Sequence, residues 1–409
     1  MSILFVNLGT YCDNTLLLNS IHFIKKKYNV ICLVDETQII PDDIKKYTYK
    51  TPKYFLEDLD LDLANPDKNV FFWSIMNPKK SYDALKWTIT MKDKILEILN
   101  IHKDIKALIV LYPVMPILVY IPEEILASLE VFILYYAPAF PNKEIPWIFD
   151  STIKNKSFNI FKPQTKNIDS SIKYLERIAL FSNKNINDII NMFSMINHVI
   201  CWDLNILKPI TPTIKEMHIS KIGGIIDWTG KTEKLPDVIN CLSKNKKFIF
   251  VSFGSYMKST LVQSNIKNLL DQLENYCMKN EDTHIILHNG EYNSKYTTSY
   301  NGYISYHEIV KKSILVIFTG SICLQNICLY HKKAMLYCPI LTEQYLWAKN
   351  YKYFTKINLY NFELANKIDI KKIIESKILN KYLEKVSKSM HSYDFRKNLY
   401  NLVKQRLML

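Results

Sequence analysis

Short runs of β-branched and aromatic residues alternate with longer amphipathic segments along most of this 409-residue sequence. This alternation predicts βαβ units, in which parallel strands form an open sheet and helices cover its faces. The pattern occurs in two series, which are separated at residues 209–224 by Pro209, Pro212 and the pair Gly223 and Gly224. The sequence therefore predicts an α/β protein with two parallel sheets joined by a linker.

The predicted strands are short apolar runs. They are residues 3–8, 30–34, 107–111, 131–135 and 198–202 in the first series, and 248–252, 284–288, 315–318 and 334–337 in the second. The predicted helices include residues 15–27, 91–103 and the lysine-rich segment 368–409. Ligands of open α/β sheets bind beyond the carboxyl ends of the strands, so the residues that follow each strand are candidates for chemistry.

The formal net charge of +14 comes from lysines scattered over the whole chain. Scattered lysines are typical of a solvated surface, although a positive field also attracts nucleic acid, anionic membranes and phosphorylated small molecules. The lysines are not interleaved with aromatic residues in a compact patch, so we expect no specific nucleic-acid partner.

The eight cysteines lie far apart, and no pair has the C-x-x-C spacing, which predicts buried thiols in a reducing compartment. The longest apolar run, residues 107–122, is short for a membrane span and contains several prolines. Residues 1–6 lack a preceding basic stretch and are interpreted as a strand instead of a signal peptide. We therefore expect a cytoplasmic protein, for which any membrane contact would be peripheral.

Two segments of the second series resemble phosphate-binding loops, because each places small or hydroxyl-bearing residues between a strand and a helix. These residues are Ser252, Gly254 and Ser255 in the first loop, and Thr319, Gly320 and Ser321 in the second. Either loop taken alone is equally well explained as a tight strand-to-helix turn. Two such loops at successive strand ends favour a pyrophosphate held between them.

Acidic residues follow two other strands. Glu343 and Gln344 combine a carboxylate with an amide, which suits the recognition of hydroxyl groups, although Thr342 and Glu343 also fit an ordinary helix start. Asp13 follows the first strand, where it is either a general base for a hydroxyl group or the N-cap of the first helix.

Taken in order, these motifs resemble the GT-B glycosyltransferases of the UDP-glycosyltransferase type, especially the sterol glucosyltransferase-like and antibiotic-glycosyltransferase branches. Residues 9–13 are similar to the family's opening turn, 250–255 to its V-x-F-G-S motif and 306–310 to its P-H-D-W-L motif. Residues 317–347 follow the donor-binding signature without a gap, through Glu343 and Gln344 to Trp347.

The resemblance implies two Rossmann-like domains that face each other across a cleft. Residues 1–222 would form the acceptor-binding domain, 223–385 the nucleotide-sugar-binding domain, and 386–409 a helix that packs back on the N-terminal domain. Further residues are expected to line the cleft, although core packing also explains Tyr136, and ordinary loop positions also explain His288 and His307. They are Gly9, Thr10, Tyr136, His288, Tyr306 and His307.

The resemblance also implies an inverting, metal-independent transfer of a hexose from a nucleotide sugar, by default a UDP-sugar, to an acceptor hydroxyl of a lipid, glycan or small molecule. Asp13 would deprotonate the acceptor, the two small-residue loops would hold the diphosphate, and Glu343 and Gln344 would bind sugar hydroxyls. The nucleotide sugar would be a co-substrate, and no cofactor or metal is expected.

Three residues depart from the family's diphosphate motif. Thr319 replaces a histidine, Ser321 a glycine and Leu324 a hydroxyl-bearing residue. Loss of one well-aimed donor commonly costs about 10²- to 10³-fold in rate. These departures support a second hypothesis, a degenerate protein that binds a nucleotide sugar without turnover. The charge supports a third, a basic protein that binds polyanions.

Overall fold

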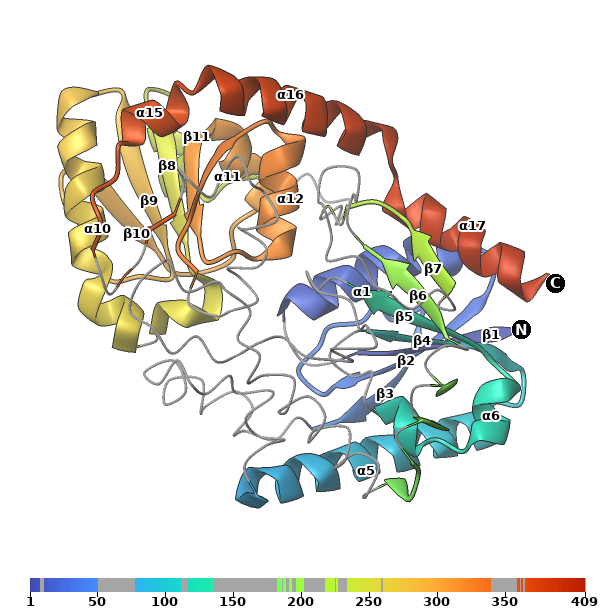
Figure 1. The fold of residues 1–409 in the computed structure, drawn as a ribbon. Helices are drawn as coiled ribbons and strands as arrows, with labels where there is room; N and C mark the ends of the chain where they lie inside the picture. The colour runs from blue at the N-terminus through green and yellow to red at the C-terminus, as the bar shows by residue number, and fades with distance from the viewer. Residues whose placement is uncertain are drawn as a thin grey trace.

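The structure is a computed structural model. It describes residues 1–7, 11–50, 78–111, 117–135, 182–185, 187–188, 191–192, 196–201, 218–224, 226, 234–258, 260–339, 359–360, 362 and 365–408. Two parallel sheets form the centres of two domains, and helices cover them (Figure 1). The predicted α/β class with two sheets is confirmed.

The N-terminal sheet has seven strands in the order β3-β2-β1-β4-β5-β6-β7. Its strands are β1 (Ser2–Val6), β2 (Asn29–Asp35), β3 (Lys45–Tyr49), β4 (Ile105–Leu111), β5 (Glu130–Tyr135), β6 (Asn197–Ile200) and β7 (His218–Lys221). The helices described in this domain are α1 (Tyr11–Ile24), α5 (Pro78–Ile101) and α6 (Glu123–Ala127).

The C-terminal sheet has five strands in the order β10-β9-β8-β11-β12. Its strands are β8 (Lys247–Ser252), β9 (Thr283–His288), β10 (Thr297–Tyr300), β11 (Ser313–Phe318) and β12 (Ala334–Tyr337). The accompanying helices are α9 (Asp237–Leu242), the 3-10 helix η3 (Gly254–Lys258), α10 (Thr260–Lys279), α11 (Tyr306–Lys312) and α12 (Ile322–Tyr330). The chain ends in α15 (Ile370–Ile374), α16 (Lys377–Ser392) and α17 (Phe395–Leu407).

The central strands form where the sequence has continuous apolar runs, because a parallel sheet that is covered on both faces buries every side chain. All five residues of β1 are buried, and so are all six of β9. Three strands were not predicted, β3, β7 and β10, and each lies at an edge of its sheet. Edge strands bury only part of their surface, so their polar and lysine-containing sequences lack the apolar signature. β7 also lies within the predicted linker.

The two last helices pack on different domains. α16 presents Leu379, Leu383 and Val386 as a buried stripe and packs against α12 of the C-terminal domain. α17 buries Phe395 and Leu399 and packs against α1 of the N-terminal domain. The predicted return to the N-terminal domain is confirmed, but it begins at Phe395, whereas the sequence placed the boundary at 386.

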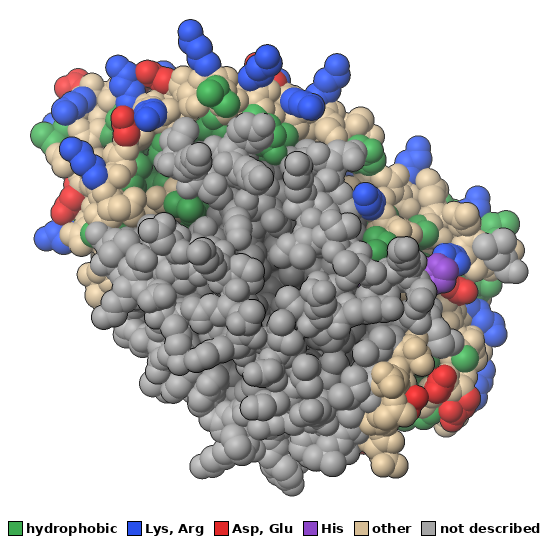
Figure 2. Space-filling model, viewed as in Figure 1, with side chains coloured by type: hydrophobic (Ala, Val, Ile, Leu, Met, Phe, Trp, Pro, Cys, Tyr) green, Lys and Arg blue, Asp and Glu red, His purple; other side chains and the backbone are tan. Residues whose placement is uncertain are grey.

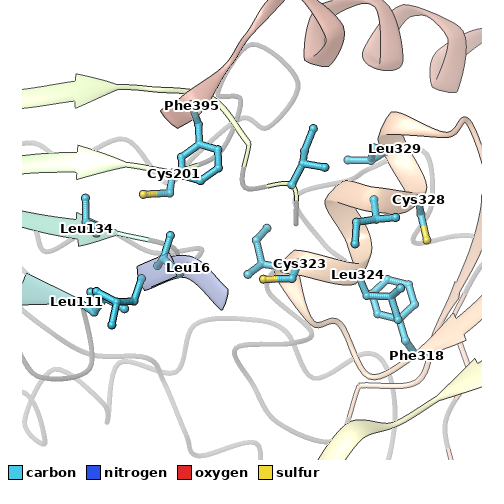
Figure 3. Close-up of a cluster of buried hydrophobic side chains, with 14 of the residues drawn as sticks. Leu16, Leu111, Leu134, Cys201, Phe318, Cys323, Leu324, Cys328, Leu329 and Phe395 are labelled. Carbon is cyan, nitrogen blue, oxygen red and sulfur yellow. The ribbon is translucent and has the colours of Figure 1, made fainter. Parts of the chain in front are cut away.

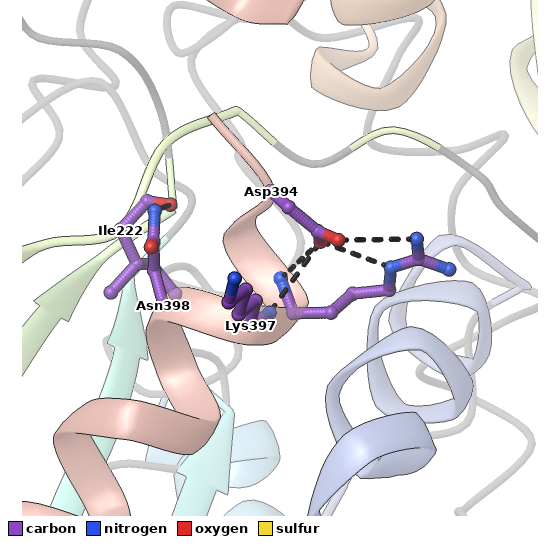
Figure 4. A network of polar contacts seen from close by, with 5 residues as sticks. Ile222, Asp394, Lys397 and Asn398 are labelled. Carbon is purple, nitrogen blue, oxygen red and sulfur yellow. Dashed lines mark hydrogen bonds and ion pairs between the residues drawn. The ribbon is translucent and has the colours of Figure 1, made fainter. Parts of the chain in front are cut away.

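Asp394 is the N-cap of α17 and directly follows Tyr393, the C-cap of α16. Its carboxylate accepts hydrogen bonds from the backbone N–H groups of Arg396 and Lys397, which caps α17, and it also forms an ion pair with the Arg396 guanidinium (Figure 4). A cap of this kind is worth about 1 kcal/mol because it satisfies N–H groups that have no partner within the helix. The side chain of Asn398, one turn later, donates to the carbonyl oxygen of Ile222 at 3.1 Å.

The linker between the domains therefore passes directly under the junction of α16 and α17. Gly223 has a φ of 95°, and a Cβ atom there would lie 3.0 Å from the Cβ of Tyr393. A Cβ atom on Gly224 would lie 2.9 Å from the terminal methyl of Met390. The two segments that connect the domains thus pack on each other, and the positive φ of Gly223 favours glycine at the contact.

Buried apolar side chains also come together from the two domains (Figure 3). The N-terminal side contributes Leu16, Leu111, Leu134, Cys201 and Phe395, and the C-terminal side contributes Phe318, Cys323, Leu324, Cys328 and Leu329. Within the described residues, none of the helices combines the length and apolar character needed to cross a bilayer.

Candidate functional site

The two predicted phosphate loops leave the C-terminal sheet side by side. β8 and β11 are parallel neighbours, and Ser252 at the end of β8 is paired in register with Phe318 at the end of β11. The segments 253–255 and 319–321 therefore start at the same level of the sheet, about 4.8 Å apart. The structure brings together the residues that the sequence selected separately.

The loop after β11 presents a helix start. Gly320 has a φ of 116°, a backbone conformation that favours glycine, and Ser321 is the N-cap of α12 without a side-chain capping bond to it. Thr319 is buried. The first N–H groups of a helix have no intrahelical acceptor and carry a partial positive charge, so they bind anions. The first turn of α12 contains no acidic side chain that would repel one.

The loop after β8 is shaped differently. Gly254 has a φ of 57° and opens η3, and a Cβ atom added to it would meet nothing within 4 Å. Ser255 follows Gly254 in η3. The longer helix α10 begins only at Thr260, so this loop offers one short 3-10 turn, and α12 carries the stronger dipole next to the strand ends.

Ser252 is tied to its neighbours by side-chain hydrogen bonds. Its hydroxyl oxygen lies 3.2 Å from Nδ1 of His288 and 3.3 Å from the hydroxyl of Tyr306. His288 is the last residue of β9, and its Nε2 lies 2.9 Å from the carbonyl oxygen of Gly302. Burial lowers the pKa of His288, against a smaller raising effect of the Gly302 carbonyl, so the imidazole is neutral at pH 7.

No sequence-family model and no curated protein sequence matches the chain. Solved structures match it over its whole length. The glycosyltransferase of kitacinnamycin has a TM-score of 0.68 at 11% identity and covers 99% of both chains. Phytolacca americana UGT2, solved with UDP-2-fluoro-glucose and pterostilbene, has a TM-score of 0.65 at 10% identity and covers 100% of both. The spinosyn rhamnosyltransferase SpnG, solved with thymidine diphosphate, has a TM-score of 0.62 at 8% identity and covers 99% of this chain and 100% of its own. This chain has the GT-B fold.

Within the GT-B fold, the N-terminal half of the predicted site is only partly described. Asp13 lies in the first turn of α1, which begins at Tyr11, so it is inside the helix and does not occupy the N-cap position. Its role as a general base stays a prediction. Five further residues of the predicted site lie outside the described residues: Gly9, Thr10, Tyr136, Glu343 and Gln344.

His307 contacts another histidine. Its Nδ1 lies 3.0 Å from Nε2 of His331, which follows the last residue of α12. Because α12 has nine residues, its two ends lie about 13 Å apart, and His307 contacts the end opposite Ser321. Burial, followed by the charges of His307 and nearby lysines, lowers the pKa of His331 to about 3. The contact with His331 places His307 beside the C-terminal end of α12, and its role as a lining residue of the donor site stays a prediction.

Sequence reasoning missed the polar residues of α12. The hydroxyl of Tyr337 on β12 donates to Oε1 of Gln325 at 2.8 Å, and both side chains are fully buried. This bond fixes the rotation of α12 against the sheet and thereby the direction of its N-terminus. The available signal was an amide pair, Gln325 and Asn326, inside a helix that is otherwise apolar.

The exposed lysines of α16 lie along one face of the helix. Lys377, Lys381, Lys385 and Lys388 are all exposed and follow a helical spacing opposite the buried stripe. Lysine side chains gather along this edge of the molecule, over α15 and α16 (Figure 2). This arrangement is typical of the solvent face of an amphipathic helix and selects neither nucleic acid nor membrane.

The expectation of a metal-free site stays a prediction. Among the residues that the structure describes, no group of His, Cys, Asp or Glu side chains is arranged to hold a metal ion. The sequence contains the D-x-D spacing, which an expectation of no metal treats as absent, at Asp58, Asp60 and Asp62. That segment lies outside the described residues.

Proposed function

We propose that the protein is a glycosyltransferase that moves a hexose from a nucleotide-diphosphate sugar to an acceptor hydroxyl. The observation that carries the proposal is the register of β8 and β11, which starts both small-residue loops at one level, with the N-terminus of α12 next to them. Proteins of the same fold supply independent support, since UGT2 was solved with UDP-2-fluoro-glucose and SpnG with thymidine diphosphate.

The diphosphate would lie against the N-terminus of α12. When the bond to the sugar breaks, negative charge grows on the departing diphosphate, and the backbone N–H groups of residues 320–322 stabilise that charge. Gly320 sets the direction of these groups through its φ of 116°. Helix dipoles and neutral donors suffice for this stabilisation, so the proposed reaction is metal-independent.

The acceptor would enter from the N-terminal domain. Asp13 in the first turn of α1 would take the proton of the acceptor hydroxyl, whose oxygen then attacks the anomeric carbon opposite the departing diphosphate. The configuration at that carbon is thereby inverted. Glu343 and Gln344 would bind the sugar hydroxyls, Tyr136 would line the acceptor side, and a UDP-sugar is the expected donor. We propose a hydroxyl of a lipid, glycan or small molecule as the acceptor.

We also propose that the protein acts in the cytoplasm. Cys32, Cys201 and Cys338 are free and buried, and burial raises the pKa of Cys32 to about 12, so this thiol stays protonated. Inert buried thiols fit a reducing compartment.

One observation favours a second candidate, binding of the nucleotide sugar without turnover. Leu324, which replaces a hydroxyl-bearing residue of the family motif, is 2% exposed and belongs to the apolar core. Leucine has no side-chain hydrogen-bond donor in any rotamer, so Leu324 cannot replace the donor of the family motif at the diphosphate site.

A panel of UDP- and TDP-sugars tests both candidates with the purified full chain. A thermal shift with one donor, together with slow release of the nucleoside diphosphate, is the result expected for the transferase. A thermal shift without release for any donor or acceptor would establish the silent binder. No shift with any nucleotide sugar, at concentrations up to the millimolar range, would refute both.

A further inference from the structure

Three segments of the C-terminal domain meet at the ring of His288. The residue itself ends β9, Ser252 ends β8, and Gly302 lies in the connection between β10 and α11. The ring also packs against the side chains of Phe250 and Tyr306, with ring centroids 6.1 Å and 5.9 Å away. A single side chain thus connects the loop after β8 to the start of α11.

The carbonyl of Gly302 fixes the direction of every hydrogen bond in this group. A carbonyl oxygen only accepts, so Nε2 of His288 carries the proton and donates to it. In the neutral ring Nδ1 is then an acceptor, and the Ser252 hydroxyl must donate to it. Because the Ser252 proton is used there, the Tyr306 hydroxyl donates to the Ser252 oxygen.

The expected role of Ser252 as a direct ligand of the donor diphosphate stays a prediction, and this order of hydrogen bonds points to another role. The sequence assigned its hydroxyl to the donor diphosphate, but in the structure its only proton points to His288, and the side chain is 3% exposed. Ser252 therefore shapes the loop that it begins, and the main-chain N–H groups after it are left to meet the phosphate.

We propose that His288 is the positioning residue of the donor site: through Ser252 it holds the loop of residues 253–255 in the shape that binds the diphosphate. The inference rests on the proposed function. Ser252 is paired with Phe318, one residue before Thr319, so a shift of the β8 end moves one loop relative to the other. The N–H groups of residues 320–322 are the ones that stabilise the charge formed on bond breaking, whereas those of residues 253–255 bind the diphosphate before and during that step. A distorted loop 253–255 therefore raises the donor KM and leaves kcat nearly unchanged.

Protonation of His288 disrupts its hydrogen bond with Ser252. A charged ring donates from both nitrogens, so Nδ1 no longer accepts from Ser252. Among the described residues, the groups that face the ring are the Ser252 hydroxyl and the Phe250 ring from β8, the Tyr306 side chain from α11 and the Gly302 carbonyl, and none of these carries a charge. Since burial lowers the pKa of His288 from 6.5, the donor KM is constant above pH 6.5 and rises only below it.

Two conservative variants separate the two hydrogen bonds. His288→Asn keeps a polar atom near the position of Nδ1, within reach of Ser252, while His288→Gln keeps one near Nε2, within reach of Gly302. We expect His288→Ala and His288→Gln to raise the donor KM about tenfold, the value of a lost buried hydrogen bond, with kcat within about threefold of wild type. His288→Asn should restore most of the affinity and remove the rise of KM below pH 6.5.

His284 provides the matched control. It is a buried histidine at the other end of β9, its Nε2 lies 2.9 Å from the hydroxyl of Thr298, and burial lowers its pKa as well. His284→Asn should lower the melting temperature without changing the donor KM or its pH profile. If His288→Ala does not fold, Ser252→Ala breaks the same bond from the other side and should raise the donor KM equally.

The outcomes distinguish this inference from the proposed function. Equal donor KM values for His288→Asn and His288→Ala, or an unchanged pH profile in His288→Asn, would overturn the role of His288 while leaving the transferase intact. Absence of nucleotide-sugar binding by the wild-type chain would overturn the proposed function and the inference together.

Discussion

In each of the two sheets, polar side chains form hydrogen bonds between neighbouring strands at the carboxyl ends. The side chains that form these bonds differ in chemistry between the two sheets. In the N-terminal sheet, Asn7 after β1 donates from its side chain to Oε1 of Gln38 at 3.2 Å, and its backbone carbonyl accepts the hydroxyl of Tyr49 from β3. In the C-terminal sheet, the corresponding bonds run through His288. Amide and phenol groups keep their protons at any pH near neutrality, whereas a histidine does not.

The helices that follow these strand ends also differ. α1 has Asp13 in its first turn, while α12 has no acidic residue there. A carboxylate in the first turn of α1 fits the proposed general base, and a first turn of α12 without acidic residues fits the proposed phosphate site. The side-chain hydrogen bonds at the N-terminal edge therefore involve groups that do not titrate near neutrality, whereas those at the C-terminal edge include a titratable histidine.

The largest expected effect is at the N-terminal edge. Asp13→Asn should reduce transfer by about 10²- to 10⁴-fold, because the acceptor hydroxyl loses its general base. Donor affinity, measured by thermal shift or calorimetry with the nucleotide sugar, should stay at the wild-type value because α12 is unchanged. Full transfer activity in this variant would show that another group takes the proton.

The next effect is at the C-terminal edge. Gly320→Ala forces a side chain into a backbone with a φ of 116°, which costs about 1–3 kcal/mol or a changed loop. Donor affinity should fall about tenfold or more, since a misdirected N–H group costs about 1.4 kcal/mol. The control is Gly223→Ala, which has a φ of 95° and lies at the linker. It should be destabilised as well but bind the donor normally, and equal affinity in the two variants would contradict the phosphate role of the loop.

The smallest and most gradual effect is the acid sensitivity of the C-terminal domain. Burial lowers the pKa values of His284, His288 and His331, the last to about 3. Below pH 6.5 the unfolded chain then binds more protons than the folded one. The contribution of these histidines to the free energy of unfolding is therefore constant above pH 6.5 and falls as the pH drops towards 3. The loss is at most about 1.4 kcal/mol per histidine for each pH unit.

Hydrogen exchange at pH 7.5 and pH 5 measures this difference strand by strand. Amides of β9 should lose protection at pH 5 before those of β1, and His331→Asn should remove part of the change. Earlier loss of protection in β1 would contradict the greater acid sensitivity expected for the C-terminal domain.

Most of the fold was predictable because parallel strands that are covered on both faces have continuous apolar sequences. The runs that became β1, β8, β9 and β11 were recognised on that basis, and the small residues after β8 and β11 marked the two loops. The edge strands were not recognised, since a strand such as β10, with the sequence Thr-Thr-Ser-Tyr, buries too little surface to need apolar residues.

The sequence by itself determined the fold class, the two domains and the candidate loops, because local periodicity and turn residues act over a few positions. Only the tertiary structure decided which side chains share a hydrogen bond. Ser252 meets His288 because β8 lies next to β9, and Asn398 reaches Ile222 over a separation of 176 residues because α17 returns across the linker. Strand order and helix docking are set by the packing of the whole core, so the direction of the Ser252 proton, and with it the role of His288, follows from the folded chain alone.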